Sequence, residues 1–319
     1  MRKITESQVE LIDAVIAEKA TGGLTPAILE KDIHVTEALH TLFSIQYPHI
    51  DLIFCGGTSL SKAHGIIERM SEDIDLKVKL SSEHRMSRSA EKNHLRNFKH
   101  QLIEQMIKAG FEQTHTGPEA HNENKYVATT WQYESCYSGD VSLRPHLRLE
   151  YTVRTPAFPV SSVLIGSLVD QLAEQEGTKL PITCIAIEET LAEKVLSFLR
   201  RYAQHRSGAG QQPWDTALVR HIYDVFCIVQ AVPHSVEKAK NHFADLVKFD
   251  TNEFSLHTTF TKNPKACMFT ALEAVETDAQ TRTEYQTRLM PLIYGKTQPG
   301  FADAFQVFKT SSNALLATL

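Results

Sequence analysis

Two aspartates, Asp73 and Asp75, stand one residue apart in the run Arg-Met-Ser-Glu-Asp-Ile-Asp-Leu of residues 69–76. In a strand, side chains alternate between the two faces, so both carboxylates would share one face with Cα atoms roughly 6.5–7 Å apart. Carboxylates that close destabilise each other as anions unless a cation neutralises them. Hard oxygen ligands suit Mg²⁺ or Mn²⁺, so the pair predicts a metal site. An isolated Asp-x-Asp, by contrast, usually marks only a solvated strand end.

A second motif with chemical potential precedes the aspartates. Residues 54–62 read Phe-Cys-Gly-Gly-Thr-Ser-Leu-Ser-Lys, which indicates a strand, a glycine pair and a helix opening with hydroxyl residues. Glycines let a phosphate approach the backbone, and a helix N-terminus presents N–H groups to an anion. Thr58 and Ser59 can cap that helix and donate to phosphate oxygens, with Lys62 on the same side. The alternative is a tight turn with a capped helix, but the neighbouring carboxylate pair favours a phosphate site.

The elements that position these motifs follow from apolar periodicity and turn residues. We predict helices at residues 6–20, 26–43, 58–67 and 91–109, the last ended by Gly110, and strands at 51–55, 74–80, 125–133, 142–153 and 182–187. Further helices are predicted at 188–201, 213–229, 235–247 and 283–292. We therefore expect an α+β domain over residues 1–185, followed by a helical domain over residues 186–319.

Composition narrows the class of protein. The 319 residues are 42% hydrophobic and 22% charged, which is typical of a soluble globular chain. No apolar run approaches the ~20 residues of a membrane helix. The five cysteines are scattered, without a Cys-x-x-Cys pair, which favours reduced thiols in a cytoplasm over zinc or disulfides. The net charge of −5 means that binding to nucleic acid would need a local basic patch.

The two motifs together resemble the nucleotidyltransferases of the AbiEii/AbiGii toxin family, within the DNA polymerase β-like superfamily. The resemblance rests on residues 56–62 and 69–76, with weaker matches at Glu30-Lys31-Asp32 and at residues 189–194. The 15 residues between Gly57 and Asp73 match the longer spacing that toxins of this family carry. The resemblance implies a polymerase β-like nucleotidyltransferase domain, with a mixed sheet and flanking helices, followed by a helical C-terminal domain that completes the active site.

The resemblance also implies roles for individual residues. Asp73 and Asp75 would be catalytic metal ligands, joined by a third carboxylate from a neighbouring strand. Glu150 is the preferred third acid, whereas the alternative, Asp140, follows Ser-Gly and is typical of a turn. The residues implied to contact the nucleotide are Gly56, Gly57, Thr58, Ser59, Lys62, Arg69 and Ser71.

Two positions of the helical domain match the family as well. The pattern Ala-Glu-Lys implies that Lys194 reaches the nucleotide phosphates, although a lysine beside an apolar stripe can equally extend its ammonium to water. The family's Lys-Asp-x-x-Asp corresponds to residues 220–224, where Asp224 matches the second, catalytic acid and His221 replaces the first. Asp224 can also pair with Arg220 at helical spacing.

The implied activity is Mg²⁺- or Mn²⁺-dependent transfer of an NMP from an NTP such as ATP, GTP or CTP to a hydroxyl. The implied acceptor is RNA, at the tRNA 3′ end, and the implied biology is a toxin with a cognate antitoxin or a phage-defence protein. Alternatives are a small-molecule or protein acceptor, or a degenerate member that only binds. Candidate RNA contacts are Lys92, Arg96 and Lys99, preceded by Arg85 and Arg88, and a cluster of Lys194, Arg200, Arg201 and Arg206, although charge runs are usually solvated faces.

Overall fold

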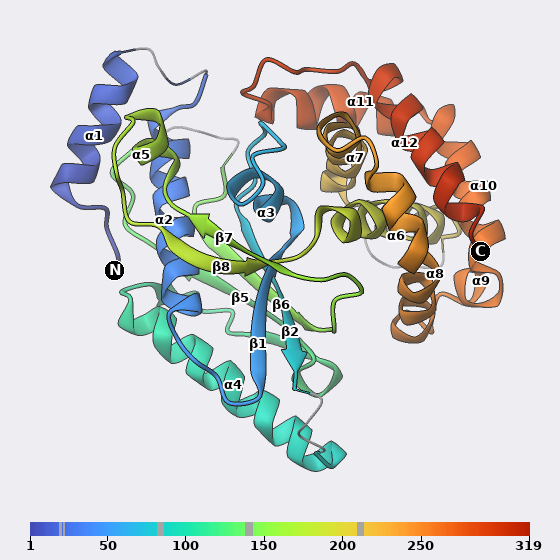
Figure 1. Cartoon of the computed structure of the whole chain (residues 1–319), viewed down its shortest axis with the longest axis horizontal. Helices are drawn as coiled ribbons and strands as arrows, with labels where there is room; N and C mark the ends of the chain where they lie inside the picture. Colours follow the sequence, from blue (N-terminus) through green and yellow to red (C-terminus); the bar gives the residue numbers. More distant parts are fainter. Residues whose placement is uncertain (19–20, 22, 82–85, 138–142, 209–213) are drawn as a thin grey trace. The chain divides into compact units, whose positions relative to one another are not determined.

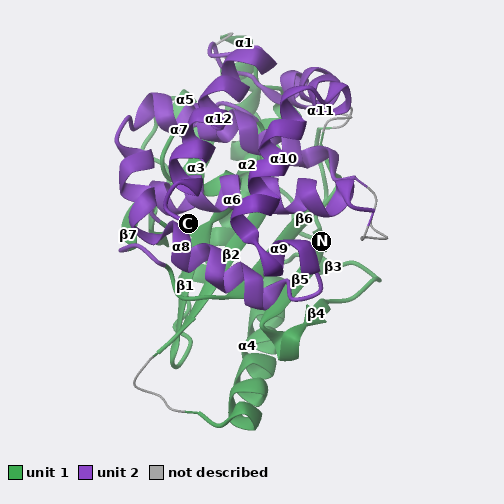
Figure 2. Cartoon of the chain, turned by 90° about the vertical axis from the view of Figure 1, so that its right-hand side faces the viewer, with its two compact units in different colours: residues 1–65, 70–156, 160–185 green, residues 66–69, 157–159, 186–319 purple. Residues whose placement is uncertain are grey.

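The computed structural model describes residues 1–18, 21, 23–81, 86–137, 143–208 and 214–319. The chain forms two compact units, coloured green and purple in Figure 2. Unit 1 comprises residues 1–65, 70–156 and 160–185, and unit 2 comprises residues 66–69, 157–159 and 186–319. These are six alternating segments, so the chain passes between the units five times.

Unit 1 is built on a mixed sheet of eight strands in the order β3-β5-β6-β2-β1-β8-β7, with β4 paired to β5. Figure 1 labels β1, β2 and β5 to β8 of this sheet. The strands are β1 (Ile50–Cys55), β2 (Asp73–Leu80), β3 (Glu112–Gln113), β4 (Glu119–His121), β5 (Tyr126–Gln132), β6 (Leu147–Val153), β7 (Ser161–Ile165) and β8 (Leu180–Cys184). The central strand β2 runs antiparallel to β1 and parallel to β6. The helices are α1 (Glu6–Ala17), α2 (Pro26–Phe43), α3 (Gly56–Lys62), α4 (Arg88–Lys108) and α5 (Leu168–Leu172).

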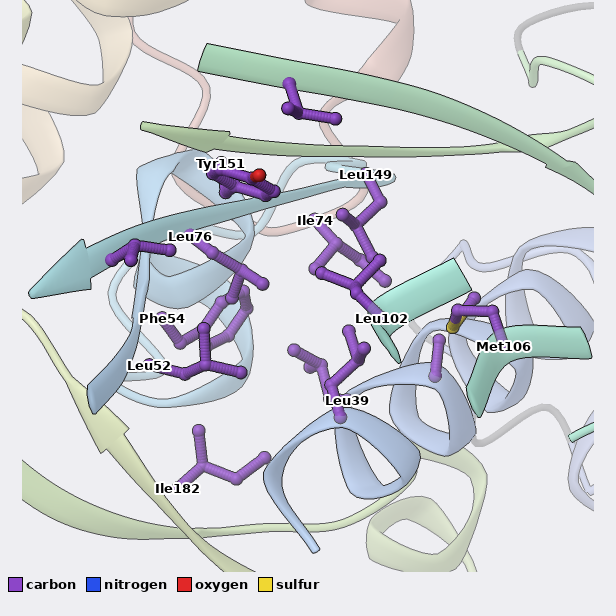
Figure 3. Close-up of a cluster of buried hydrophobic side chains, with 14 of the residues drawn as sticks. Leu39, Leu52, Phe54, Ile74, Leu76, Leu102, Met106, Leu149, Tyr151 and Ile182 are labelled. Atoms are coloured by element: carbon purple, nitrogen blue, oxygen red, sulfur yellow. The ribbon is translucent and has the colours of Figure 1, made fainter. Parts of the chain in front are cut away.

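The core of unit 1 lies on one face of this sheet. Ile74 and Leu76 of β2 point to that face and pack in one buried cluster with Leu39 of α2 and Leu102 of α4 (Figure 3). Because side chains alternate along a strand, the polar residues Asp73 and Asp75 point to the opposite face.

Local sequence signals explain where the helices begin and end. Thr25 caps α2 by accepting a hydrogen bond from the Ile28 N–H, and proline follows at the first helical position. Ser87 caps α4 in the same way. At its other end α4 gives way to Gly110, whose φ of +91° suits glycine, as the sequence predicted.

Unit 2 is helical, with α6 (Ile187–Arg206), α7 (Arg220–Ala231), α8 (Ser235–Glu253), α9 (Thr258–Lys262), α10 (Pro264–Glu276), α11 (Ala279–Glu284) and α12 (Phe301–Leu316). The apolar stripe of α6, formed by Leu191, Val195 and Phe198, is fully buried. Among the described residues, no helix is both long and apolar enough to cross a lipid bilayer.

The expected fold class, an α+β region with a mixed sheet and flanking helices followed by a helical region, is confirmed. Some boundaries differ. Helix α3 starts at Gly56 and stops at Lys62, earlier than predicted at both ends. The predicted helix at 213–229 begins only at Arg220, after a 3₁₀ turn. In the range predicted as a helix at 283–292, helix α11 ends at Glu284 and a π turn follows over Tyr285–Leu289. A 3₁₀ turn then covers Met290–Leu292, where Pro291 lacks the N–H that an α-helix requires.

Candidate active site

The predicted carboxylates lie on the polar face of the unit 1 sheet. Asp73 and Asp75 of β2 stand opposite Arg148 and Glu150 of β6 in the parallel register. Adjacent strands are only ~4.8 Å apart, so β2 and β6 carry their polar side chains along one shared face. The structure therefore brings the three predicted acids onto neighbouring positions of one sheet face, which we call the acid face. The competing residue, Asp140, lies outside the described residues.

Glu150 nevertheless turns its carboxylate away from β2. Its Oε2 accepts a hydrogen bond of 2.9 Å from the Tyr126 hydroxyl, and its Oε1 is paired with the Arg148 guanidinium. Tyr126 belongs to β5, on the side of β6 that faces away from β2. Burial, followed by the charge of Glu150, raises the pKa of Tyr126 to about 12, so the phenol stays a hydrogen-bond donor. Within the described part of the chain, no three acidic, histidine or cysteine side chains are arranged to hold one ion.

Asp73 has a guanidinium partner of its own. The Arg144 Nη1 lies 2.7 Å from Asp73 Oδ1, and the Arg144 side chain is 39% exposed. This arginine follows the undescribed residues 138–142 and precedes β6. Sequence reasoning missed it, because the contact joins a loop to a strand some seventy positions earlier and no spacing rule connects the two.

The glycine turn before α3 is fitted closely to Asp75. Gly56 has a φ of +76°, which glycine adopts without steric cost. A Cβ atom built on Gly56 would lie 2.0 Å from Asp75 Oδ2, closer than any real contact. The backbone at Gly56 can therefore lie against this carboxylate only because the residue has no side chain.

The hydroxyl residues of α3 are committed to bonds within unit 1. Thr58 Oγ1 lies 2.9 Å from Ser71 Oγ and also donates to the carbonyl of Asp73. Ser59 Oγ donates to the carbonyl of Gly56. Helix α3 has no side-chain cap, so Thr58 and Ser59 do not cap it as expected. Thr58 instead joins α3 to the start of the strand that carries the acids.

Lys62 is likewise held within unit 1. Its ammonium pairs with Asp32 of α2, and the other oxygen of Asp32 accepts from the Leu168 N–H. Both side chains are mostly buried, so this pair fixes the end of α3 against α2.

The remaining predicted residues meet in a buried cluster inside unit 2. Both oxygens of Asp224 accept hydrogen bonds of 2.7 Å from Arg69, and Lys194 Nζ lies 2.6 Å from Asp224 Oδ2. Burial alone would raise the pKa of Asp224, but the two cations hold this pKa well below its usual range. Burial and the charges of Lys194 and Arg201 lower the pKa of His221, which is therefore neutral. Two cations thus share the Asp224 carboxylate.

Most of the side chains in the two predicted basic clusters pair with other residues or lie away from the acid face. Helix α4, which carries Lys92, Arg96 and Lys99, packs on the apolar face of the sheet, opposite the acid face. Lys99 donates to Asn124 and Arg88 pairs with Glu123, while Arg85 lies outside the described residues. In the second cluster, Arg200 pairs with Asp250 and Arg201 with Asp215.

A mixed sheet that carries an Asp-x-Asp pair behind a glycine turn has the arrangement expected of a nucleotidyltransferase. A family model described as "Nucleotidyl transferase AbiEii toxin, Type IV TA system" matches residues 37–307. The chain belongs to this family of nucleotidyltransferase toxins.

Two further comparisons concern curated proteins and solved structures. No curated protein matches the chain. Among solved structures, MenT4, a nucleotidyltransferase toxin from Mycobacterium tuberculosis H37Rv, is similar over 84% of this chain and 99% of its own, with 16% identity and a TM-score of 0.39.

Proposed function

We propose that Asp73 and Asp75 hold Mg²⁺ or Mn²⁺ and that the protein transfers an NMP from an NTP to an acceptor hydroxyl. The observation that supports the proposal is the acid face. There Asp75 lies so close to the Gly56 backbone that position 56 has no room for a side chain. Family membership supports the reaction class.

The donor set fits a divalent ion at two of the three acids. Asp73 and Asp75 offer hard oxygen ligands from alternate positions of one strand. Glu150 is held by Arg148 and Tyr126, so its carboxylate must turn from β5 toward β2 to join them. We propose that it makes this turn as the third acid.

A divalent ion held by Asp73 and Asp75 would supply the positive charge that activates the acceptor hydroxyl and neutralises the α-phosphate. The acceptor oxygen bonds to the α-phosphorus, the bond from phosphorus to the bridging oxygen breaks, and pyrophosphate leaves. The hydroxyl proton passes to the acid face and then to water. The Gly56 and Gly57 backbone positions the donor by binding its phosphate oxygens. From the sequence resemblance we propose that Lys194 and Arg69 bind phosphate as well.

The acceptor that we propose is RNA, at the 3′ end of tRNA, which the sequence resemblance supports. The α4 cations are not assigned to the reacting end, because α4 covers the other face of the sheet. A cognate antitoxin is proposed from the type IV toxin–antitoxin description of the family. We assign the reaction to the cytoplasm, where NTPs are plentiful.

The test incubates purified protein with each α-labelled NTP, Mg²⁺ and total RNA, then separates RNA, protein and small molecules. We expect label in the RNA fraction. Asp73→Asn and Asp75→Asn should each lower transfer at least about a hundredfold, because an amide keeps the shape but loses the ligand charge. That loss corresponds to ~3 kcal/mol of transition-state stabilisation.

Asp51→Asn is the matched control, since Asp51 is an exposed aspartate on the neighbouring strand β1 and should be dispensable. Full activity in either acid-face variant, with melting curves like those of the wild type, would remove the pair from the mechanism. Label in the protein or small-molecule fraction alone would contradict RNA as the acceptor.

A further inference from the structure

Two buried charged side chains, Glu72 and Lys31, hold the main chain of Arg144 beside the acid face. The Arg144 backbone N–H donates to Glu72 Oε2 at 3.0 Å, and its carbonyl accepts from Lys31 Nζ at 2.6 Å. Lys31 also donates to the carbonyl of His146 and lies 3.2 Å from Glu72. The main chain of Arg144 is therefore fixed at both its N–H and its carbonyl.

The two anchoring side chains are themselves inaccessible. Lys31 is 0% exposed and Glu72 is 5% exposed. Burial lowers the pKa of Lys31, while the charge of Glu72 acts in the opposite direction. Burying an ion pair costs several kcal/mol per ion unless further hydrogen bonds satisfy it. Here the carbonyls of Arg144 and His146 supply those bonds, so the pair and the loop stabilise each other.

The guanidinium binds one carboxylate oxygen of Asp73, a residue that we propose as a metal ligand. Asp73 and Asp75 share one face as like charges, and Arg144 places a positive charge 2.7 Å from Asp73 Oδ1. A divalent ion bound by Asp73 must compete with this contact. A guanidinium that leaves a carboxylate is also suited to phosphate, which it can bind through two parallel hydrogen bonds.

We propose that Arg144 is a resident counter-cation of the acid face, which a divalent ion displaces from Asp73 and which then binds the triphosphate of the incoming NTP. This inference rests on the proposed function. It predicts that metal alone binds weakly, and that metal and nucleotide bind more tightly together than separately.

The experiment measures Mn²⁺ affinity by electron paramagnetic resonance in wild type, Arg144→Gln and Asp73→Asn. Glutamine keeps the main-chain anchors and removes the guanidinium, which lies 2.7 Å from Asp73 Oδ1 and 3.8 Å from Glu72 Oε1. Arg144→Gln should bind Mn²⁺ about two- to fivefold more tightly without nucleotide, the range expected for losing one partly exposed pair. It should bind an α,β-methylene NTP about tenfold more weakly with Mn²⁺ present.

Two further variants serve as controls. Arg88→Gln removes an arginine from the exposed Glu123 pair and should change neither affinity. Arg144→Lys keeps the charge and should stay close to wild type for Mn²⁺, which separates competition from a folding effect.

The outcomes distinguish this inference from the proposed function. A Mn²⁺ site that Asp73→Asn removes but Arg144→Gln leaves unchanged or weakens overturns the role of Arg144 alone. A wild-type protein without any Mn²⁺ site sensitive to Asp73→Asn overturns both. Tighter Mn²⁺ binding with unchanged nucleotide affinity overturns the transfer of Arg144 to the triphosphate.

Discussion

Several polar and charged side chains of this protein are buried, and His34 is one of them. His34 of α2 is fully buried, and neither ring nitrogen has a hydrogen-bond partner among the described residues. Its ring instead lies 4.0 Å from that of Tyr133, centroid to centroid. Burial, assisted by the charges of Arg2 and Lys31, lowers the pKa of His34 to about 3.

His34 should therefore weaken the fold in acid. Below the ordinary histidine pKa near 6.5 the unfolded chain binds a proton that the folded chain refuses, so stability falls as pH drops from ~6.5 toward 3. At pH 5 the loss is about 2 kcal/mol. In urea unfolding at pH 8, His34→Leu should change the free energy of unfolding by under ~1.5 kcal/mol. At pH 5 the wild type loses about 2 kcal/mol that the variant keeps, so the variant should gain about 2 kcal/mol of stability relative to wild type.

His100→Leu serves as the control, because His100 is exposed on α4 and remains solvated in both states. An identical pH dependence in wild type and His34→Leu would mean that the imidazole accepts a proton while buried.

At the scale of elements, the junction of β1 and α3 decides where Asp75 can lie. Gly56→Ala adds a Cβ at 2.0 Å from Asp75 Oδ2 and strains a φ of +76°. The strain should cost about 1–2 kcal/mol in unfolding experiments. The displaced carboxylate should lower nucleotidyl transfer about a hundredfold, as misplacements near 1 Å do.

Gly65 separates these two effects. It has a φ of +60°, but no atom lies within 4 Å of an added Cβ. Gly65→Ala should show the loss of stability without the loss of transfer. Equal activity in both alanine variants would mean that the turn does not position Asp75.

Sequence patterns predicted the elements whose signals are local and left out the contacts that are not. Alternation along β2 was sufficient to place Asp73 and Asp75 on one face, and a glycine marked the end of α4. Glu30-Lys31-Asp32 could not be interpreted this way. Three consecutive helical residues point in different directions, yet all are largely buried, because α2 is enclosed by segments 135–137, 144–146 and 168 that bind them in turn. Only the tertiary structure shows those partners.

At the scale of the whole molecule, the question is whether unit 2 takes part in the reaction. Lys194→Met removes one of two cations from Asp224, which keeps its double hydrogen bond to Arg69. Apo stability should therefore change by under ~1 kcal/mol, while KM for NTP rises about tenfold through the loss of a charged hydrogen bond to phosphate.

Lys238→Met is the control, since Lys238 forms an exposed pair with Glu188 in the same unit. NTP titrations of transfer and melting curves with and without nucleotide supply the measurement. Equal stabilisation of wild type and Lys194→Met by nucleotide would exclude Lys194 from phosphate binding.

The six alternating segments of the chain restrict how such a gene can evolve. Residues 66–69 and 157–159 belong to unit 2 although they are encoded inside the stretch for unit 1. Arg69 supplies the partner of Asp224, and the N–H groups of Ala157 and Phe158 bind Glu189 of α6. A recombination event that joined the 3′ part of the gene to a foreign sheet would bring the helices without these segments. Because unit 1 also extends from residue 1 to residue 185, a single crossover before residue 185 divides unit 1 and one after residue 66 divides unit 2. Exchange between related genes should therefore keep both units intact only where residues 1–319 are exchanged together.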